Sequence, residues 1–434
     1  MSKQFKIPRG TADILPEEWA KYWLNVEGVA YCFCENYGYK QIRTPIFEET
    51  ELFARSMGAT SDVVNKQMLN ISSQKEGEES SGLSLRPEGT AAVVRSYIQN
   101  RLDKKESLSK LFYIGPMFRG ERPQKGRLRQ FHQIGVEAIG PNSISPYLDA
   151  EVIALGAHLL DVMGVKSYKV LINTLGTQED KQKFSDLLRE KLKPHVSKLS
   201  EYSQQRYERN VFRILDSKEK QDQAIIQQLD IGQSYLSEES KKYFEEVKRL
   251  LDTLNISYEF DPNLVRGLDY YTHTVFEFID TSSSSAQNAL GAGGRYNRLV
   301  EQLGGPQVDA IGFALGIERI ILALPDDGKD IRRRCTYVIA MDDSCVETTF
   351  DLAHALRKAG FKVETSYKVS SMKSQMRQAN KLNASLVIII GEEEIKKEAV
   401  TVKDMDEGTQ EEISIKNNNY KELMQKISDV NQRS

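Results

Sequence analysis

The chain has 434 residues, of which 40% are hydrophobic and 28% are charged, and its formal net charge at pH 7 is -3. This is the composition of a globular protein of two or three domains, and the small net charge excludes a bulk polycation, so any contact with nucleic acid must depend on local patches. Four cysteines are too few for a disulfide framework, and the absence of an apolar leader or a long apolar run predicts a cytoplasmic protein without membrane contact.

The chain begins with a predicted helix and strand. Apolar residues recur at steps of three and four over Trp19–Tyr37, which predicts an amphipathic helix that ends at Gly38. The composition of Tyr39–Phe47 predicts a strand, and Pro45 within it indicates a sheet edge or a bulge. A helix packed on a sheet is the ordinary interpretation of this pair.

A polar loop and a short motif follow. Residues 74–82 (QKEGEESSG) are polar and contain two glycines, which predicts a mobile loop. Residues 83–90 (LSLRPEGT) form a predicted extended segment with Glu88 and Thr90 on one side, and a helix is expected over 91–100. These two side chains could simply cap that helix. Alternatively, a carboxylate in a buried site is a suitable partner for the ammonium group of an amino acid.

The most informative stretch is a predicted hairpin. Two apolar-rich runs, 111–118 and 128–139, flank a charged loop that contains glycine and proline. Side chains of the second run alternate between two faces. One face is apolar, as a core face should be, and holds Leu128, His132, Ile134, Val136 and Ala138. The other face holds Arg127, Arg129, Phe131, Gln133 and Glu137, with a gap at Gly135.

This second face of the hairpin is chemically varied. Exposed strand faces are commonly polar, but they carry Lys, Thr and Ser more often than two guanidinium groups, an aromatic ring, an amide and a carboxylate. We therefore interpret the face as a site that binds a phosphate ester, stacks a base and holds a small polar molecule.

The middle of the chain combines helices with a second motif. A helix is predicted over 149–163, and residues 178–255 are charged and favour helix. Residues 264–278 (LVRGLDYYTHTVFEF) then join an arginine and two tyrosines to an alternating strand. Packing in a core is the ordinary alternative for Tyr270 and Tyr271.

Two further segments precede a change of pattern. Residues 290–297 (LGAGGRYN) contain three glycines, which allow the backbone to approach a ligand closely. Residues 310–324 (AIGFALGIERIILAL) predict a strand, a glycine turn and a helix, in which Arg319 needs an anionic or aromatic partner because an unpaired buried guanidinium is costly. After a charged linker at 326–334, strands and helices alternate over 335–434, which predicts a largely parallel sheet.

Several of these segments together resemble the class II aminoacyl-tRNA synthetases, and specifically the histidyl-tRNA synthetases of the bacterial type. Residues 118–133 (FRGERPQKGRLRQFHQ) are similar to motif 2 in its histidyl form. The run 264–271 (LVRGLDYY) matches a histidine-specific motif of that family, and 290–297 resembles a second one, with Asn297 in place of the usual Asp. The LRPEGT run is similar to a family segment, the N-terminal helix and strand resemble motif 1, and 310–324 resembles motif 3.

The resemblance implies an α/β protein with two domains. Residues 1–325 would form a class II catalytic domain, with an antiparallel sheet, flanking helices and a helical insertion at about 176–255 that reaches toward the acceptor arm of tRNA. Many relatives carry cysteines in this insertion, and this chain has none there, so a metal or redox role for it is not expected. After the linker at 326–334, residues 335–434 would form an anticodon-binding domain with a mostly parallel sheet.

The resemblance also implies a reaction and a set of residues. The chain would activate L-histidine with ATP and Mg2+ to histidyl-adenylate and pyrophosphate, and would then transfer histidine to the 3′ end of tRNA(His), as a cytoplasmic homodimer paired through motif 1. The implied catalytic residues are Arg119, Arg266 and Arg319. The implied histidine-binding residues are Glu88, Gly89, Thr90, Arg119, Gln133, Glu137, Arg266, Tyr270, Tyr271 and Tyr296. The implied ATP-binding residues are Arg119, Glu121, Arg127, Phe131 and Arg319, and no metal ligand is identified directly.

The histidine-binding residues have expected partners on the substrate. Glu88, Thr90 and Gln133 would hold the ammonium group of histidine. Glu137 and Tyr271 would bind the two imidazole nitrogens, because a site built to hydrogen-bond a substrate rejects analogues that lack the bond.

The ATP-binding residues have expected partners as well. Arg119 would bind the α-phosphate and Arg127 the outer phosphates, since such a reaction needs alignment and charge stabilisation. Phe131 would stack the adenine, with Arg319 on the opposite side. Glu121 would help to place the adenine or a metal-bound phosphate.

Some points stay open at the level of sequence. Arg266 would add a fixed positive charge at the α-phosphate. No general base is evident for the second step, so the hypothesis is that a phosphate oxygen of the adenylate accepts the proton. One alternative is a synthetase-like regulatory subunit of histidine biosynthesis that binds histidine without aminoacylation activity, and another is a synthetase-like sensor of uncharged tRNA. The retained arginines and the C-terminal domain argue against the first, and the lack of a kinase segment argues against the second. Lys373, Arg377 and Lys381 share a predicted helix face that is either solvated or in contact with RNA.

Overall fold

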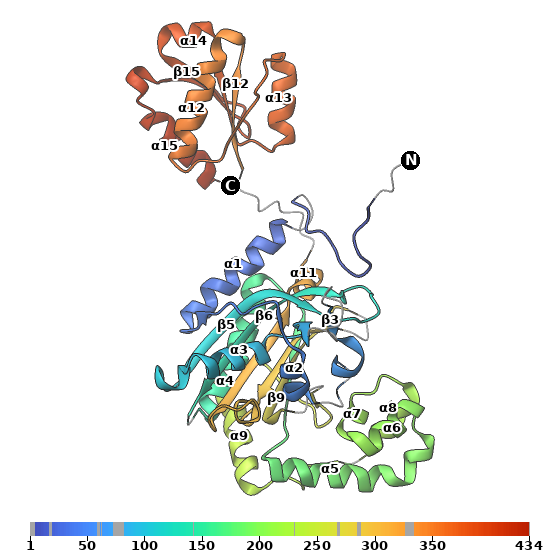
Figure 1. Ribbon diagram of the computed structural model, residues 1–434. Helices are drawn as coiled ribbons and strands as arrows, with labels where there is room; N and C mark the ends of the chain where they lie inside the picture. Colours follow the sequence, from blue (N-terminus) through green and yellow to red (C-terminus); the bar gives the residue numbers. More distant parts are fainter. Residues whose placement is uncertain are drawn as a thin grey trace. The chain divides into compact units, whose positions relative to one another are not determined.

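The chain folds into two compact units, 1–329 and 330–434 (Figure 1). The computed structural model describes residues 5–16, 20–58, 61, 63–72, 82–141, 143–229, 231–266, 270–283, 288–325 and 334–433. Most of the loop expected over 74–82 and of the linker expected over 326–334 lies outside these residues. Among the described helices, each is too short or too polar to cross a bilayer.

An eight-stranded sheet forms the centre of the first unit (Figure 1). Its strands, in spatial order, are β1 (Lys40–Gln41), β5 (Ser109–Phe118), β6 (Gln130–Gly140), β11 (Asp309–Gly316), β10 (Ala289–Arg295), β9 (Thr272–Asp280), β7 (Tyr168–Thr174) and β8 (Glu259–Phe260). The pairs β1–β5 and β7–β8 are parallel, and the other neighbours are antiparallel. The expected α/β fold with an antiparallel catalytic sheet is confirmed.

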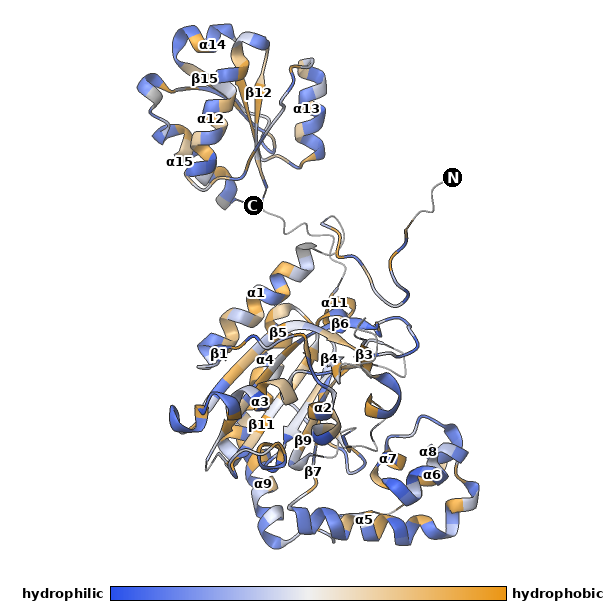
Figure 2. Cartoon of the chain, in the orientation of Figure 1, coloured by the Kyte–Doolittle hydropathy of each residue, from blue (hydrophilic) through white to orange (hydrophobic). Residues whose placement is uncertain are grey.

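Strand β6 lies between β5 and β11 and separates the core from the polar face. Ile134, Val136 and Ala138 are fully buried in the main hydrophobic core, which confirms the alternation predicted from Gln130 onward. Helices that pack in the same core are α1 (Ala20–Asn36), α4 (Pro146–Met163), α9 (Glu238–Thr253) and α11 (Ile317–Ala323). Figure 2 shows the apolar strands in the middle of the unit.

The prediction that this strand begins at Leu128 is wrong, because β6 begins at Gln130. The chain turns tightly before it at Gly126, whose φ of +71° is a conformation that suits glycine. The side chain of Arg129 then turns back, and its Nε donates to the carbonyl of Glu121 at 3.3 Å. Leu128 and Arg129 therefore do not follow the predicted alternation.

The single strand predicted over 39–47 is also wrong. The segment contributes β1 to the large sheet and its last residue to β2 of a separate three-stranded sheet. That sheet has the order β2 (Phe47–Glu49), β4 (Leu83–Leu85) and β3 (Leu69–Ile71), and helices α2 (Thr50–Met57) and α3 (Thr90–Gln99) follow its strands. Arg86 fixes the bend, because its guanidinium donates to the carbonyls of Thr44 at 3.1 Å and Pro45 at 3.3 Å.

The helical region after β7 is held together by buried carboxylates. Its helices before α9 are α5 (Gln178–Leu192), α6 (Glu201–Arg209), α7 (Phe212–Leu215) and α8 (Lys220–Ile226). Asp222 accepts hydrogen bonds from the amide and hydroxyl of Ser200 (2.8 and 2.7 Å) and from the hydroxyls of Ser203 and Ser217 (both 2.6 Å). Burial works to raise the pKa of Asp222, but these hydrogen bonds hold it below its usual value. Serine hydroxyls around one carboxylate thus connect α6 with α8 and with the segment between α7 and α8.

The second unit is an α/β domain around a five-stranded sheet. Its strands, in spatial order, are β13 (Val363–Thr365), β12 (Thr336–Ala340), β14 (Leu386–Ile390), β15 (Ala399–Asp404) and β16 (Gln410–Ser414). The main helices are α12 (Val346–Lys358), α13 (Met372–Lys381), α14 (Glu392–Lys397) and α15 (Lys421–Gln432). Three parallel strands are followed by the predicted terminal hairpin, so the sheet is mixed rather than mostly parallel.

Candidate active site

A cavity of about 270 Å³ lies over the polar face of β6 and extends across β11, β10 and β9. With the exception of Gly89, all the residues that the sequence analysis assigned to histidine or ATP line this cavity. They come from five separate stretches of the chain, which the sheet brings together. Residues 267–269 of the LVRGLDYY motif lie outside the described residues.

One end of the cavity is built around the carboxyl group of Glu137. This group is buried and accepts hydrogen bonds from the hydroxyl of Thr90, at 2.6 Å, and from the hydroxyl of Tyr296. Burial raises the pKa of Glu137 to about 8, although the two hydroxyls work to lower it. Gly312 makes room for the group, since a Cβ there would come within 2.1 Å of Glu137 Oε2. The site therefore holds a carboxyl group that can change charge near neutral pH.

Glu88 plays the capping role that the sequence analysis considered. Its carboxylate accepts the backbone N–H groups of Thr90 at 2.5 Å and of Ala91 at 2.9 Å, in the first turn of α3. Burial raises the pKa of Glu88, and the hydrogen bonds from the helix oppose this shift. Because Glu88 also lines the cavity, capping holds its carboxylate in place beside Glu137 without excluding contact with a ligand.

Tyr113 of β5 is a cavity residue that the sequence analysis missed. Its ring occupies the gap predicted at Gly135, where a Cβ would come within 2.1 Å of Tyr113 Cζ. A Cβ on Gly89 would come within 2.2 Å of the same atom. Gly89 therefore serves the site by admitting the ring of Tyr113. The registered pairing of Tyr113 with Gly135 on neighbouring strands produces this contact.

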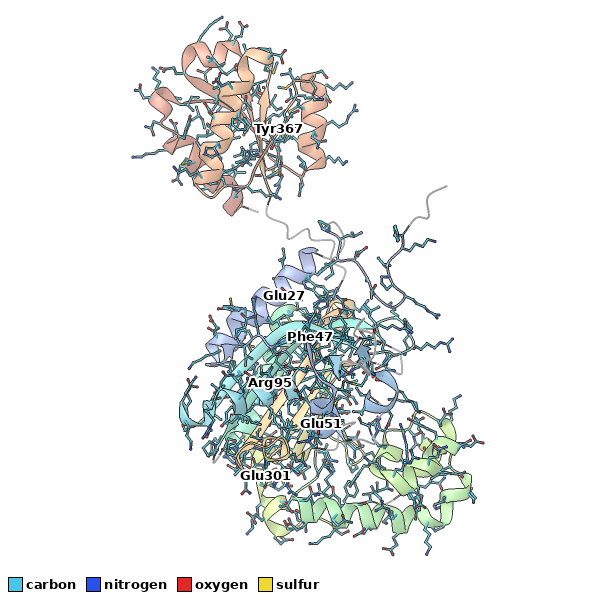
Figure 3. All side chains as sticks on the ribbon, in the orientation of Figure 1. Glu27, Phe47, Glu51, Arg95, Glu301 and Tyr367 are labelled. Atoms are coloured by element: carbon cyan, nitrogen blue, oxygen red, sulfur yellow. The ribbon has the colours of Figure 1, made fainter. Side chains whose placement is uncertain are left out.

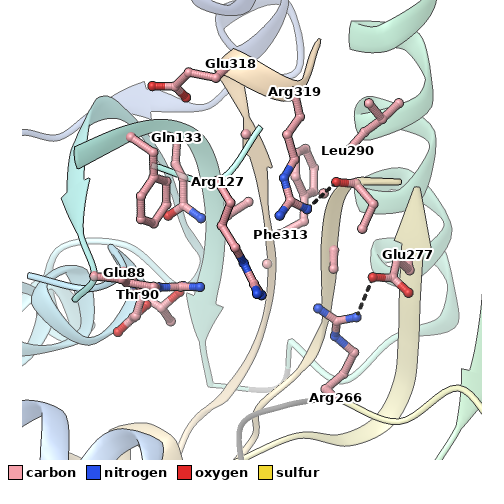
Figure 4. A pocket seen from close by; sticks show the side chains of 18 of the residues that line it. Glu88, Thr90, Arg127, Gln133, Arg266, Glu277, Leu290, Phe313, Glu318 and Arg319 are labelled. Atoms are coloured by element: carbon pink, nitrogen blue, oxygen red, sulfur yellow. Dashed lines mark hydrogen bonds and ion pairs between the residues drawn. The ribbon is translucent and has the colours of Figure 1, made fainter. Parts of the chain in front are cut away.

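The opposite end of the cavity is rich in guanidinium groups (Figure 4). Arg119 donates from Nε to the carbonyl of Pro87 at 2.9 Å, and its guanidinium lies 5.1 Å from the ring centroid of Phe131. Arg319 donates to the carbonyls of Gly126 at 3.1 Å and Ala289 at 2.6 Å. Burial lowers the pKa of both arginines, and neighbouring arginines lower that of Arg319 further. These backbone contacts fix the two guanidinium groups without neutralising them.

Two more arginines at this end are paired with carboxylates. Arg127 Nε lies 2.5 Å from Glu121 Oε2, and Arg266 Nη1 lies 3.3 Å from Glu277 Oε1. Nε of Arg266 is buried and has no hydrogen-bond partner among the described residues. Together with Arg119 and Arg319, the arginines outnumber these carboxylates, so this end favours an anionic ligand. In Figure 4 the guanidinium groups of Arg127, Arg266 and Arg319 converge on the cavity, and Arg319 reaches it from α11.

An aromatic wall separates the two ends of the cavity from the helical insertion. Tyr270, Tyr271 and Tyr296 are buried. The ring centroid of Tyr270 lies 4.6 Å from that of Tyr271 and 5.7 Å from that of Tyr296. Lys181 of α5 donates to the carbonyl of Tyr271 at 3.0 Å, which connects the wall to the insertion. Gln133 Oε1 is buried without a hydrogen-bond partner among the described residues, so it is available to a ligand.

A buried ion pair lies next to this wall, because Arg295 precedes Tyr296 in the chain. Arg295 and Asp149 are fully buried, with Nε and Oδ1 2.6 Å apart. The side-chain oxygen of Asn297 accepts from Arg295 at 3.3 Å and from the amide of Ala310 at 3.2 Å. The substitution of Asn297 for the usual Asp therefore keeps the acceptor that the structure uses.

Two carboxylates of the cavity were missed by the sequence analysis. Glu277 lies on β9 and pairs with Arg266. Because it stands between the buried Phe276 and Phe278 in an alternating strand, the sequence could have shown that its side chain lies on the face away from the core. Glu318 precedes Arg319, and its carboxylate accepts the backbone N–H of His132 at 2.9 Å. No sequence pattern indicated that contact, because it joins residues of β6 and α11.

The chain is similar to known proteins along almost its whole length. A family model described as Histidyl-tRNA synthetase matches residues 10–320, and one described as Anticodon binding domain matches residues 336–421. The chain is 45% identical over 415 residues to the histidine--tRNA ligase of Bacillus cytotoxicus, which covers 94% of this chain and 96% of that protein. It is 44% identical over 417 residues to the histidine--tRNA ligase of Anoxybacillus flavithermus, with 95% and 97% covered.

A solved structure agrees with these sequence relatives. The crystal structure of apo histidyl-tRNA synthetase from S. aureus has a TM-score of 0.79 and 39% sequence identity to this chain. The match covers 98% of this chain and 99% of that one. It therefore includes both compact units.

Proposed function

The chain belongs to the histidyl-tRNA synthetase family and ligates histidine to tRNA with the use of ATP, and from this premise we propose how the residues of its cavity carry out the reaction. The relatives that share nearly the whole chain are ligases by name, which favours aminoacylation over the regulatory alternative. One observation carries the proposal. A corner of carboxyl and hydroxyl groups and a cluster of guanidinium groups lie at opposite ends of one cavity, as a histidine joined to a phosphate requires.

The carboxyl corner binds histidine in this proposal. Glu88, Thr90 and Gln133 hold the ammonium group, which suits a capped carboxylate and an amide oxygen that lacks a partner. Glu137 and Tyr271 bind the imidazole nitrogens, one as an acceptor and the other through its hydroxyl. Tyr296 and Tyr270 complete the wall of this pocket, and the bond from Tyr296 to Glu137 orients the carboxyl group.

The guanidinium end binds ATP. Arg119 and Arg266 face the α-phosphate, and Arg127 faces the outer phosphates, with Glu121 holding its guanidinium in place. The adenine stacks on Phe131, and Arg319 lies on the opposite side of the base. Two carbonyl contacts fix Arg319, which supports its use as a rigid plane.

Mg2+ is expected with ATP, and the residues present fit a metal held mainly by phosphate. Among the described residues, no group of three or more His, Cys, Asp and Glu side chains could hold a metal ion. Mg2+ is usually bound by one or two carboxylates together with substrate phosphates. Glu121, Glu277 and Glu318 are carboxylates that line this end of the cavity and would contribute, and the metal would neutralise phosphate charge there.

The chemistry has two steps. In the first, a carboxylate oxygen of histidine forms a bond to the α-phosphorus of ATP and the bond to pyrophosphate breaks, while Arg119 and Arg266 stabilise the negative charge on the phosphoryl oxygens. In the second, a hydroxyl at the 3′ end of tRNA(His) attacks the carbonyl carbon and AMP leaves with the bonding electrons. The carboxylates at the reacting end already have partners, Glu121 in Arg127, Glu277 in Arg266 and Glu318 in the amide of His132, so a phosphate oxygen of the adenylate accepts the proton.

ATP–pyrophosphate exchange with each of the twenty amino acids, for the wild type and Arg266→Ala, tests this assignment. We expect exchange with histidine alone, and a loss of about 100-fold or more in the variant, because one charged donor at the reacting group is worth about that much. Arg298→Ala is the matched control, since Arg298 is exposed and pairs with Glu301. Histidine binding without exchange would refute the enzyme assignment, and exchange that survives Arg266→Ala would refute the mechanism.

We further propose a cytoplasmic homodimer that pairs through the motif 1 region. Leu24 and Tyr31 of α1 and Ile46 and Phe47 near β2 are large apolar side chains that are exposed in the single chain. Pairing of two copies through these elements would remove such side chains from water, which favours association. Light scattering at micromolar concentration tests this proposal, and a monomer would contradict it.

The second unit contacts tRNA(His) in this proposal. Lys373, Arg377 and Lys381 lie on the exposed face of α13, opposite its buried residues. Tyr367, labelled in Figure 3, precedes this helix and is 75% exposed. Basic side chains beside an exposed aromatic ring suit the phosphates and bases of a single-stranded loop.

A further inference from the structure

The segment before α1 contacts the loop that carries groups assigned to ATP. This motif 2 loop, residues 119–129, joins β5 to β6 and holds three of the residues assigned to ATP. Residues 8–11 (PRGT) form a turn, because the carbonyl of Pro8 accepts the amide of Thr11 at 3.2 Å and its hydroxyl at 2.8 Å. This leading turn lies far from the motif 2 loop in the sequence and meets it in the fold.

The leading turn is bound to the base of the motif 2 loop. The carbonyl of Gly10 accepts the backbone N–H of Arg129 at 2.6 Å, and the carbonyl of Arg129 accepts the N–H of Arg119 at 2.8 Å. A Cβ on Gly10 would come within 2.8 Å of Pro123 Cγ and 2.9 Å of Arg129 Cγ. The φ of Gly10 is +87°, so both the backbone conformation and the lack of space require glycine here.

Arg129 connects the leading turn to the ATP end of the cavity. Its Nε donates to the carbonyl of Glu121 at 3.3 Å, and the carboxylate of Glu121 lies 2.5 Å from Nε of Arg127. The guanidinium of Arg119 has a separate support, since its Nε donates to the carbonyl of Pro87 at 2.9 Å. A displacement of the leading turn should therefore move Glu121 and Arg127 and leave the guanidinium of Arg119 in place.

Burial does not account for the position of the leading turn. The large apolar side chains on both sides of it, Phe5, Ile7, Ile14 and Leu15, are exposed. Hydrophobic stabilisation is roughly proportional to the apolar area removed from water, so these side chains contribute little to the core. The directional contacts of Gly10 with the motif 2 loop are what place this segment.

We propose that the leading turn is a positioning element for ATP, an inference that rests on the proposed function. It holds the motif 2 loop so that Arg127 and Glu121 face the outer phosphates, and it acts through Arg129 without touching the substrate itself. Small shifts are sufficient, because a displacement of about 1 Å in a positioning group can cost about 100-fold in rate.

Gly10→Ala tests this proposal, because the new Cβ must displace Pro123 or Arg129. Gly304→Ala is the matched control, since Gly304 has the same φ of +87° and open space around its Cβ position. Thr11→Ala removes the hydroxyl that closes the turn, and Thr11→Ser restores it. Each full-length variant is assayed for histidine-dependent ATP–pyrophosphate exchange at varied ATP and at varied histidine, and calorimetry measures the Kd for ATP without histidine.

We expect Gly10→Ala to raise KM for ATP by about tenfold, with kcat and KM for histidine within about twofold of the wild type, because loss of uniform binding raises KM alone. The Kd for ATP should rise by a similar factor. Thr11→Ala should give a smaller increase in KM for ATP, whereas Thr11→Ser and Gly304→Ala should match the wild type.

An unchanged KM for ATP in Gly10→Ala would overturn the inference. Equal losses for ATP and for histidine would overturn it too, since they would show a general structural role. A wild type without histidine-dependent exchange would instead refute the proposed function, and the calorimetric Kd for ATP would then decide the role of the leading turn.

Discussion

The carboxyl group of Glu137 should lose a proton when histidine binds. Burial raises its pKa to about 8, so about nine-tenths of the ligand-free protein carries a protonated Glu137 at pH 7. An imidazole N–H that donates to this group favours its ionised form. We therefore expect the wild type to release about 0.9 more protons per bound histidine than Glu137→Gln at pH 7, and about 0.1 more at pH 9.

Two measurements check this prediction. Calorimetric titration of histidine in buffers of different ionisation enthalpy gives the number of protons released. The cost of ionising Glu137 at pH 7 is about 1 kcal/mol, so the affinity for histidine should rise several-fold, to about tenfold, between pH 7 and pH 8.5 in the wild type and not in the variant. Glu301→Gln, at an exposed glutamate, is the control and should behave as the wild type does.

The stability of the ligand-free protein should depend on pH in the matching direction. The folded chain keeps a proton on Glu137 that the unfolded chain loses near pH 4.5, so this group lowers the free energy of unfolding as the pH rises from about 4.5 to about 8. The full difference of about 3.5 pH units corresponds to at most about 5 kcal/mol relative to Glu137→Gln. Equal proton release by the two proteins, or a stability difference that does not change with pH, would refute the reasoning.

Three further substitutions test the packing around the site. Gly135→Ala should destabilise the protein by about 1–3 kcal/mol in thermal unfolding, because the new Cβ meets the ring of Tyr113. Asp222→Ala should lower stability by about 3 kcal/mol, because several buried donors lose their acceptor; its depressed pKa means that this stabilisation is present at neutral pH and is lost on acidification. Asp149→Asn should cost about 3–5 kcal/mol, since it leaves Arg295 buried without a counter-charge.

Each of these three predictions has its own control and contrary outcome. Gly28 is exposed and has open space around its Cβ position, so Gly28→Ala should stabilise helix α1 by about 0.5–1 kcal/mol. A neutral Gly135→Ala would show that Tyr113 can move aside. For Asp222→Ala, unchanged unfolding would contradict the role of the hydrogen bonds. For the buried pair, Asp149→Leu combined with Arg295→Met should cost less than Asp149→Asn alone.

The sequence by itself determined the chemistry of the site. The alternation of β6 was predictable from Gln130 onward, because pairing on both sides imposes a period of two residues and one face must be apolar. The motif segments identified most of the polar and charged residues that line the cavity, although not Tyr113, Glu277 or Glu318, without any knowledge of their distances. Glu277 could have been added from its place between two apolar positions of an alternating strand.

Other features were decided only by the tertiary structure. The bend after β1 depends on the guanidinium of Arg86, which reaches the carbonyls of a segment more than forty residues away along the chain. Tyr113 fills the gap at Gly135 because of the register between β5 and β6, and a shift of one residue would have sent its ring to the other face. A local sequence pattern does not contain such a register.

The sequence also did not predict which groups of the site carry a charge. Glu137 has a raised pKa because strands, α3 and the segment around Tyr296 together remove it from water. The sequence allowed Glu88 to be a helix cap or a ligand-binding group, and the structure confirms the cap and places Glu88 in the lining of the cavity, where ligand binding stays a prediction. Local patterns determine periodicity and residue type, whereas burial and contacts between distant segments determine which groups carry a charge and which side chains meet.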